Sequence, residues 1–246
     1  MRLLALVLTL ACFSSACAEG VLKKEYEYEE ELYLSLDGSA TLNVNASVPA
    51  LVALRGADLA TDPRARIDRD QVRELFSGPG VTVTRVTLAR RDLRRMVHVG
   101  IEVQDVRQLQ RVSLFSWSNY RFDRNGDVFE YHQVVGAPHG KPVGDVGWKG
   151  NELVAFRLHI PSQIPFHNSP SRKVQRGNIV VWEQPLADRL KGEPVDIQVN
   201  MAPESILYST LILFGGTAVA ALAAMALVIW WVARSGRDAE VAESRS

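Results

Sequence analysis

The sequence has little cysteine, no net charge and, beyond its first residues, a single long apolar run. Its two cysteines, Cys12 and Cys17, both lie near the amino end of the 246-residue chain. The remaining residues contain no thiol, which excludes a disulfide framework, cysteine nucleophiles and cysteine metal sites in that part. We therefore expect an ordinary hydrophobic core to hold the domain together.

An excess of charge is the second absence. The chain has 28 basic and 28 acidic side chains, and its formal net charge at neutral pH is zero. Non-specific binding to DNA or RNA needs a strong positive field. We therefore expect no nucleic-acid partner.

The first 18 residues are typical of a targeting segment. Arg2 supplies the positive start, and residues 3–13 form an apolar run that is too short for a normal membrane span. Residues 1–18 therefore predict a signal peptide. A second interpretation makes Cys17 a lipidated amino terminus, which would add a lipid anchor. Against it, Ser14 stands where lipidation motifs usually have a large aliphatic residue.

The long apolar run covers residues 206–233, with no charged side chain between Glu204 and Arg234. Roughly 20 apolar helical residues cross a bilayer core about 30 Å thick, so this run predicts one transmembrane helix. Arginines in the tail, residues 234–246, favour a cytoplasmic position for it. The chain is therefore predicted to cross the cell membrane once, with residues 19–204 as an extracytoplasmic domain.

The domain opens with a strongly alternating stretch, residues 25–36. Glutamates occupy one face, and tyrosines and leucines occupy the other, which indicates a half-buried antiparallel strand that ends in the Asp37-Gly38 turn. The glutamate face is interpreted as a solvated strand face in preference to a cation site. Glu30 breaks the pattern on the apolar face, which suggests a position near an open end.

Further alternating stretches and turn signals continue to residue 201. Together they predict an α+β fold, built on a mostly antiparallel, strongly curved sheet of about nine strands with short helices, followed by the transmembrane helix. The helices are expected at residues 49–56, 68–77 and 186–190. The strands after the first are expected at residues 41–48, 81–89, 96–103, 112–122, 128–135, 153–160, 178–183 and 195–201.

Four arginines flank one predicted hairpin turn. Arg90, Arg91, Arg94 and Arg95 surround a single aspartate in the sequence RRDLRR. Guanidinium groups bind phosphate in a bidentate manner, so these arginines are candidate contacts for lipid headgroups. The alternative interpretation is a solubilising surface loop.

Catalytic and cofactor motifs are scarce. The glycine-rich loop at residues 136–150 contains GAPHGK, but its spacing is one residue short for a phosphate loop and Pro142 replaces the required Ser or Thr. His132, His139 and Asp145 match no metal-ligand spacing. We therefore expect no cofactor, no metal and no enzyme, and keep a hydrolase as a third hypothesis. The side chains to follow under that hypothesis are His132, His139, His167 and Glu130.

The last third of the domain carries a recognisable pattern, P-x5-HN-x7-RGN-x3-W. Its residues are Pro161, His167, Asn168, Arg176, Gly177, Asn178 and Trp182. The pattern, with the closing strand and terminal membrane helix, resembles the LppM-like domain of bacterial exported proteins. This resemblance implies a cell-envelope protein with a lipid-binding domain on the outer face of the membrane, and it brings no catalytic residues.

Two functions follow as hypotheses. The first is binding of membrane lipid or another amphiphile at the membrane surface, with aromatic side chains as the apolar surface unless they form the core. The second is a non-enzymatic module that docks an envelope protein, through the loop at residues 161–177 or through a small-residue stripe on the membrane helix. The aromatic residues are Tyr26, Tyr28, Phe115, Trp117, Tyr120 and Phe122, and the stripe is Gly216, Ala220 and Ala224.

Overall fold

The computed structural model describes residues 24–243, and within them ten strands form two sheets. The predicted signal peptide and Cys17 lie outside the described residues. The larger sheet has the order β3-β4-β2-β1-β7-β9, made of β3 (Val81–Arg91), β4 (Arg94–Val103), β2 (Ala40–Ser47), β1 (Tyr26–Leu34), β7 (Leu153–His159) and β9 (Ile179–Pro185). The smaller has the order β5-β6-β10-β8, made of β5 (Ser118–Asn125), β6 (Val128–Val135), β10 (Val195–Met201) and β8 (Phe166–His167).

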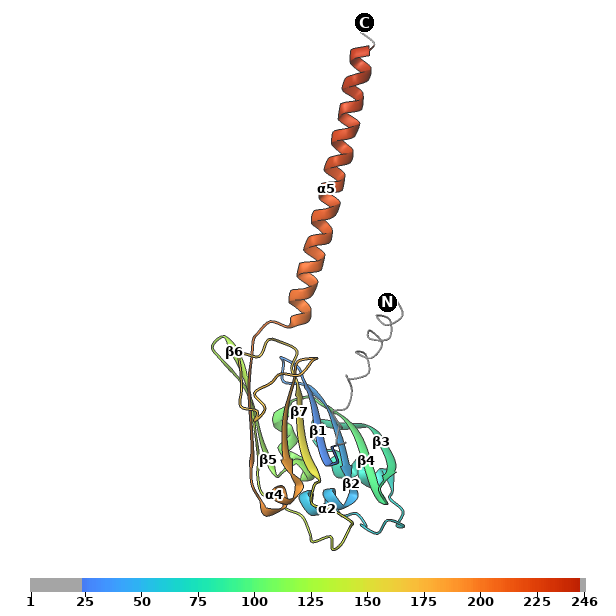
Figure 1. Ribbon diagram of the computed structural model, residues 1–246, viewed down its shortest axis with the longest axis vertical. Coiled ribbons are helices and arrows are strands. Elements are labelled where there is room, and N and C mark those ends of the chain that lie inside the picture. The colour runs from blue at the N-terminus through green and yellow to red at the C-terminus, as the bar shows by residue number, and fades with distance from the viewer. Residues whose placement is uncertain (1–23, 244–246) are drawn as a thin grey trace, which may run out of the picture.

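Short helices connect and cover the sheets, and one long helix leaves the domain (Figure 1). The predicted α+β fold is confirmed, with two sheets in place of one. The β1–β7 pair is parallel, and the other strand pairs are antiparallel. The helices are α2 (Val48–Arg55), α3 (Arg69–Phe76), η1 (Val106–Arg111), η2 (Ser113–Phe115), α4 (Leu186–Lys191) and α5 (Ile206–Glu243).

Local sequence explains where the first two helices begin and end. The Ser47 hydroxyl accepts a hydrogen bond from the Ala50 amide at the start of α2, and Gly56 ends that helix in the left-handed conformation, at φ 68°. Asp68 caps α3 in the same way through the Asp70 amide. Both helices therefore form where their capping residues predict them.

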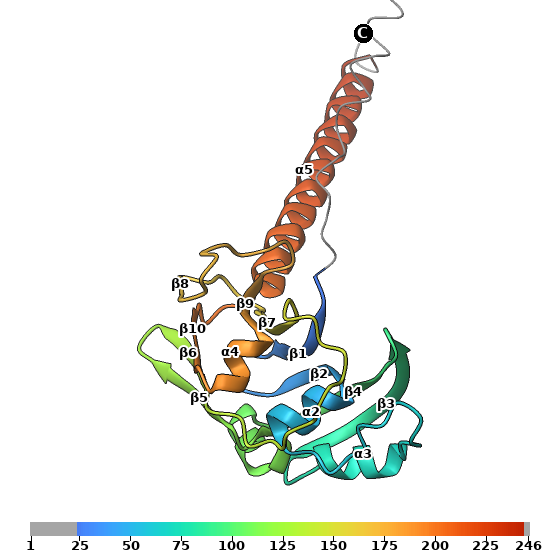
Figure 2. The ribbon, with the colours of Figure 1, turned by 60° about the horizontal axis from the view of Figure 1, so that its bottom comes forward.

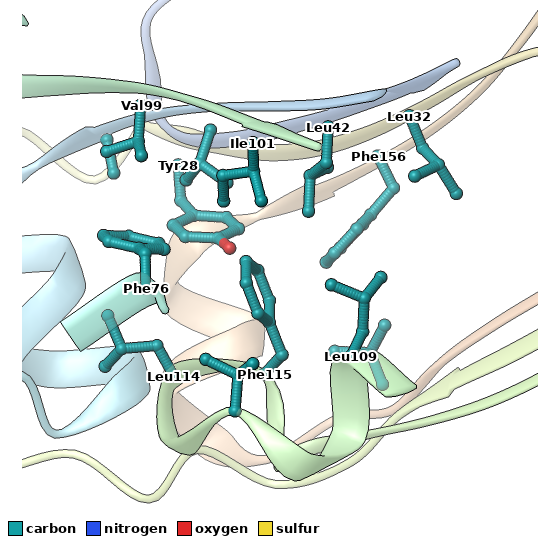
Figure 3. Packing of buried hydrophobic residues seen from close by; sticks show 14 of the residues in the cluster. Tyr28, Leu32, Leu42, Phe76, Val99, Ile101, Leu109, Leu114, Phe115 and Phe156 are labelled. Carbon is teal, nitrogen blue, oxygen red and sulfur yellow. The ribbon is translucent and has the colours of Figure 1, made fainter. Parts of the chain in front are cut away.

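The core lies between the larger sheet and the elements that cover its inner face. Figure 3 shows Tyr28, Ile101 and Phe156 of that sheet pointing toward Phe115 and Leu109 of the 3-10 helices. All five side chains are buried. α2 and the 3-10 helices lie on this inner side of the sheet (Figure 2).

One predicted strand is wrong in its first half. Residues 112–122 were expected to be extended, but residues 113–115 form η2 and the strand begins only at Ser118. Val112, Leu114 and Phe115 are all buried. A strand would send alternate side chains to opposite faces, whereas a 3-10 turn lets neighbouring side chains enter the core together.

The larger sheet has two distinct ends. β1 and β7 run parallel, which places His159 beside Tyr33 at one end and Leu153 beside Tyr26 at the other. α5 begins at the first of these, which we call the helix end, because the Ile206 amide donates to the Pro161 carbonyl at 2.9 Å. The β3–β4 turn lies at the opposite, hairpin end. A nine-residue strand separates them by about 30 Å.

α5 is long and apolar enough to cross a bilayer. Its segment Ile206–Trp231 has 26 residues and a mean hydropathy of 2.4, and none of it is buried against the rest of the chain. It is the one such helix among the described residues. Figure 1 shows it extending away from the domain without folding back.

Candidate functional site

The segment at residues 161–178, here called the basic loop, joins the domain to α5. Besides the bond between Ile206 and Pro161, the Ala202 amide donates to the Gln163 carbonyl at 2.9 Å. Ser162 and Ser205 form an isolated β-bridge beside these contacts. Backbone contacts therefore tie the linker and the first residue of α5 to the basic loop.

Asn178 and Gly177 shape the end of the basic loop. Asn178 has a left-handed backbone, at φ 60°, and its side-chain amide donates to the carbonyls of Ile160 at 2.7 Å and Ser162 at 2.5 Å. Gly177 adopts φ 88°, which a side chain would strain. These two residues bend the chain into β9 and brace the turn that leads from β7.

Asn168 braces the middle of the basic loop. Its side-chain oxygen accepts hydrogen bonds from the Trp182 indole at 3.0 Å and from the Gln198 amide at 2.9 Å, and its side-chain amide donates to the Asp196 carbonyl at 3.0 Å. His167 next to it pairs with Val199 in the smaller sheet. The motif residues Pro161, His167, Asn168, Gly177, Asn178 and Trp182 therefore build the joint that carries α5.

An open groove of about 680 Å³ lies at the helix end, beside this joint. The motif residues Pro161 and Gly177 belong to its lining, so the joint and the groove share residues. The rest of the lining comes from the ends of β1, β2, β4 and β7. These residues are Tyr33, Leu34, Ser35, Ser39, Ala40, Thr41, Glu102, Val103, Gln104, His159 and Ile160.

The main aromatic feature of the groove is a stacked pair. The rings of Tyr33 and His159 lie 3.9 Å apart at 19°, and Tyr33 remains 41% exposed. The Nε2 atom of His159 lies 2.7 Å from the Glu31 carboxylate, which orients the imidazole. Partial burial and, to a lesser extent, the nearby charge of Glu31 raise the pKa of the Tyr33 hydroxyl, so this hydroxyl stays a neutral hydrogen-bond donor.

The sequence alone did not lead us to predict this pair. Tyr33 lies on the glutamate face of β1, where an aromatic residue is the exception, and that was an available signal. No local signal could place His159 beside it, because the two strands lie more than a hundred residues apart and pair in parallel. The groove therefore depends on the topology of the sheet.

The interior between the sheets is filled. The small cavity lined by Tyr131 and Trp182 holds only about 10 Å³, too little for an acyl chain. The aromatic residues first considered as a lipid surface belong mostly to the core, and Tyr26 is half-buried on the outer face. The buried ones are Tyr28, Phe115, Trp117, Tyr120 and Phe122.

Glu30 does not lie near an open end, as its place in the pattern suggested, but is buried and paired. Its carboxylate forms an ion pair with Arg55, which is itself buried and also donates to the Tyr28 hydroxyl. The Arg55 guanidinium stacks 3.7 Å from the Trp117 ring. The acid therefore sits on the apolar face because the core supplies its partner, and an exposed end is not needed.

Arg189 lies on the other side of this cluster. Its guanidinium is 5.0 Å from the Trp117 ring and donates to the carbonyls of Gly136 and Glu193. Burial and the charge of Arg55 lower its pKa to about 10, so it remains protonated at neutral pH. This buried cluster ties α2 and α4 to both sheets.

The outer glutamates of β1 are only partly solvated. Glu29 pairs with Arg157 at 2.5 Å, and Glu27 is fully buried. Glu25 and Glu27 meet the predicted headgroup arginines at the hairpin end. The prediction of a solvated strand face therefore holds only in part, because basic side chains cover this face.

The arginines at residues 90–95, here called the arginine hairpin, divide into two classes. Arg94 is buried and forms ion pairs with Glu25 and Glu27. Arg91 pairs with Glu27 at 2.9 Å and donates to the Tyr26 carbonyl at 2.5 Å. These two cations are therefore neutralised within the domain.

Arg90 and Arg95 remain more accessible, although Arg95 is half-buried and donates to the Pro63 carbonyl at 3.0 Å. The whole arginine hairpin lies at the hairpin end, opposite the start of α5. A headgroup role for Arg90, Arg91, Arg94 and Arg95 stays a prediction, and the geometry turns two of the four inward.

The residues kept for a hydrolase are dispersed. His132 pairs with Asp196 at 2.6 Å on the outer face of the smaller sheet, and Glu130 accepts from Asn125 in the same sheet. His139 lies beside α2. Asp145 accepts from the Gly147 amide in a loop at the hairpin end. Among the described residues, no three histidine or acidic side chains gather as a metal site.

Comparison with known proteins gives one distant likeness. No protein-family model matches the sequence, and no curated protein matches it. The structure is similar to the NMR structure of the folded domain of the Mycobacterium tuberculosis LppM protein, with a TM-score of 0.42 and 11% sequence identity. The similarity covers 76% of this chain and 95% of that one. It amounts to a weak LppM-like relationship of fold and transfers no functional residue.

Proposed function

We propose that this chain is a membrane-anchored envelope protein whose extracytoplasmic domain binds the polar end of a lipid, or of another amphiphile, in the groove at the helix end. α5 serves as the anchor, and the domain acts by binding and not by catalysis. The observation that carries the proposal is the position of the groove. Its lining includes Pro161, whose carbonyl holds the first amide of α5.

A lipid bound in this position can keep its acyl chains in the bilayer and place its headgroup in the groove. The carbonyl of Pro161 lies where α5 starts, so an acyl chain need not leave the bilayer for its headgroup to reach the groove. The lining supplies an aromatic ring, hydroxyl groups and one carboxylate, and no Lys or Arg. Such a surface suits a headgroup rich in hydroxyl or ammonium groups.

The filled core supports a surface site. A cavity of about 10 Å³ cannot take up an acyl chain, so the domain would bind the headgroup and leave the chains in the membrane. Docking of an envelope protein, through the basic loop or through Gly216, Ala220 and Ala224, stays a prediction.

A photocrosslinking experiment tests the groove. The full chain is placed in nanodiscs that contain a phospholipid with a photoreactive headgroup, and crosslinked peptides are identified by mass spectrometry. We expect crosslinks on the peptides that carry Tyr33 and His159. The variant Thr41→Trp, which fills the groove opposite Tyr33, should abolish them.

The matched control is Thr87→Trp. Thr87 is an exposed threonine on β3 outside the groove, so this variant adds the same bulk elsewhere on the larger sheet. Crosslinks restricted to α5 in the unaltered chain would contradict the proposal. Equal crosslinking of Tyr33 and His159 in the unaltered chain and in Thr41→Trp would also contradict it.

A further inference from the structure

The basic loop has a one-sided charge that the domain does not neutralise. Residues 161–178 contain Arg172, Lys173 and Arg176 and no acidic residue. Among the described residues, no carboxylate forms an ion pair with any of these three side chains, and all three are exposed. The nearest acid along the chain, Glu183, pairs with Lys24. Glu204 in the linker to α5 is exposed and forms no ion pair with the described residues.

Apolar side chains are exposed in the same loop. Phe166 and Val174 expose 48% and 44% of their surface. They line an open depression of about 550 Å³ together with Ile164 and Arg172. Cations and exposed apolar groups on one segment are the combination found on surfaces that rest in the headgroup region of a bilayer.

The backbone presents Arg172 in a costly conformation. Its φ is 51°, in the left-handed region that a non-glycine residue enters at a cost of about 1 kcal/mol. The turn is closed by the Arg172 amide, which donates to the Ser169 carbonyl at 3.0 Å. The guanidinium forms no hydrogen bond or ion pair within the described part of the chain.

The joint places this loop next to the membrane anchor. The carbonyls of Pro161 and Gln163 accept from the amides of Ile206 and Ala202, so both ends of the linker are tied to the loop. Asn168 and Asn178 fix the rest of the loop to the sheets. The loop therefore cannot move far from the point where α5 leaves the domain.

We propose that the basic loop is a second membrane contact, which rests on the anionic headgroups of the bilayer that α5 enters and so orients the domain. Arg172, Lys173 and Arg176 bind the lipid phosphates, and Phe166 and Val174 lie at the boundary of the acyl region. This inference rests on the proposed anchoring by α5, and it does not require a ligand in the groove.

The expected strength follows from the number of cations. Each Lys or Arg near an anionic surface strengthens the contact about fivefold at moderate salt. The contact should weaken as salt is added, because screening shortens the range of the attraction to about 10 Å at 0.1 M. A bilayer without anionic lipid should leave the loop largely in water.

A fluorescence experiment tests this contact in the full chain. Cys12 and Cys17 are replaced by serine, and Val174→Cys carries an environment-sensitive fluorophore. The protein is placed in nanodiscs of phosphatidylcholine alone or of equal parts phosphatidylcholine and phosphatidylglycerol, each with a spin-labelled quencher lipid. We expect several-fold stronger quenching with phosphatidylglycerol, and its loss in the triple variant Arg172→Glu, Lys173→Glu, Arg176→Glu.

The matched control reverses three exposed arginines that lie outside both basic clusters, through Arg64→Glu, Arg66→Glu and Arg69→Glu. It changes the net charge equally and should leave the quenching intact. Equal quenching in both lipid mixtures, or an equal loss in the control, would overturn the inference. Failure of the chain to enter nanodiscs would instead contradict the anchoring by α5, so the two failures are distinguishable.

Discussion

The two basic clusters of this domain differ in what surrounds them. The arginine hairpin carries four arginines, two of which are neutralised by Glu25 and Glu27 at the hairpin end. The basic loop carries three cations, none of which is neutralised by the described part of the chain, at the helix end. One cluster therefore stabilises the fold, and the other is available to a partner.

The density of arginines in a sequence is therefore a poor guide to a binding surface. RRDLRR is the denser cluster, yet Glu25 and Glu27 at the start of β1 supply carboxylates to it. The basic loop spreads its cations over five residues and meets no acid. A cation is free to bind an external anion only where the fold brings no internal one.

The largest expected effect concerns Arg94. Replacing it by alanine leaves the buried Glu27 with one ion-pair partner, the partly exposed Arg91, and the hydrogen bond from the Trp148 indole. Removing one partner of a buried ion pair typically costs about 3–5 kcal/mol in the free energy of unfolding. Arg172→Ala should change it by less than about 0.5 kcal/mol. Denaturant unfolding in detergent, followed by near-ultraviolet circular dichroism, compares the two. Similar losses of unfolding free energy in the two variants would contradict the distinction between the clusters.

The fold itself was largely predictable, and the reason is local. Alternation in β1, the Asp37-Gly38 turn and the caps of α2 and α3 are encoded within a few neighbouring residues. The division into two sheets and the parallel pairing of β1 with β7 could not be predicted from the sequence, because they depend on contacts across most of the chain.

The candidate site was predicted only in part. The motif residues Asn168, Asn178 and Trp182 were singled out, but as a family pattern and not as the joint of α5. The groove was missed because Tyr33 and His159 meet only in the folded sheet. Arg91 and Arg94 were expected at the surface because their partners on β1 were interpreted as solvated.

An acid placed in the basic loop should make it resemble the arginine hairpin. Gln175 is exposed and lies between Lys173 and Arg176 along the chain. Gln175→Glu should neutralise about one cation and lower the affinity for anionic lipid about fivefold. The affinity is measured as the quenching of a label at Val174 against phosphatidylglycerol content. An unchanged titration would show that charge does not drive the contact.

Replacing Arg172 by glycine should change the stability of the domain and its membrane contact in opposite directions. Arg172→Gly suits φ 51° and should raise the free energy of unfolding by up to about 1 kcal/mol. The same variant removes a cation, so the dependence of quenching on phosphatidylglycerol should fall. A variant that lowers stability would indicate that the Arg172 side chain makes a contact within the fold.

The smallest effect is a titration that reports on the arginine hairpin. Burial and, to a lesser extent, the charges of Arg91 and Arg85 lower the pKa of His98 below its usual value. Arg91→Gln should therefore raise that pKa, and NMR titration of the His98 ring protons measures it. An unchanged pKa would mean that the charge of Arg91 does not reach the strand beside it.

The sign of the corresponding pH dependence follows from the same shift. The unfolded chain takes up a proton on His98 near pH 6.5, before the folded chain does. The free energy of unfolding should therefore fall as the pH decreases below about 6.5, and level off once the folded chain is protonated too. His98→Asn should remove this contribution, as pH-dependent denaturation would show.

One measurement addresses the contrast between the clusters directly. A single fluorophore is placed either at Val174→Cys in the basic loop or at Leu93→Cys in the arginine hairpin, where Leu93 is 88% exposed. Both chains are placed in the same phosphatidylglycerol-containing nanodiscs with a quencher lipid. We predict strong quenching at residue 174 and almost none at residue 93. Equal quenching, or quenching at residue 93 alone, would contradict the assignment of the helix end as the membrane-facing end.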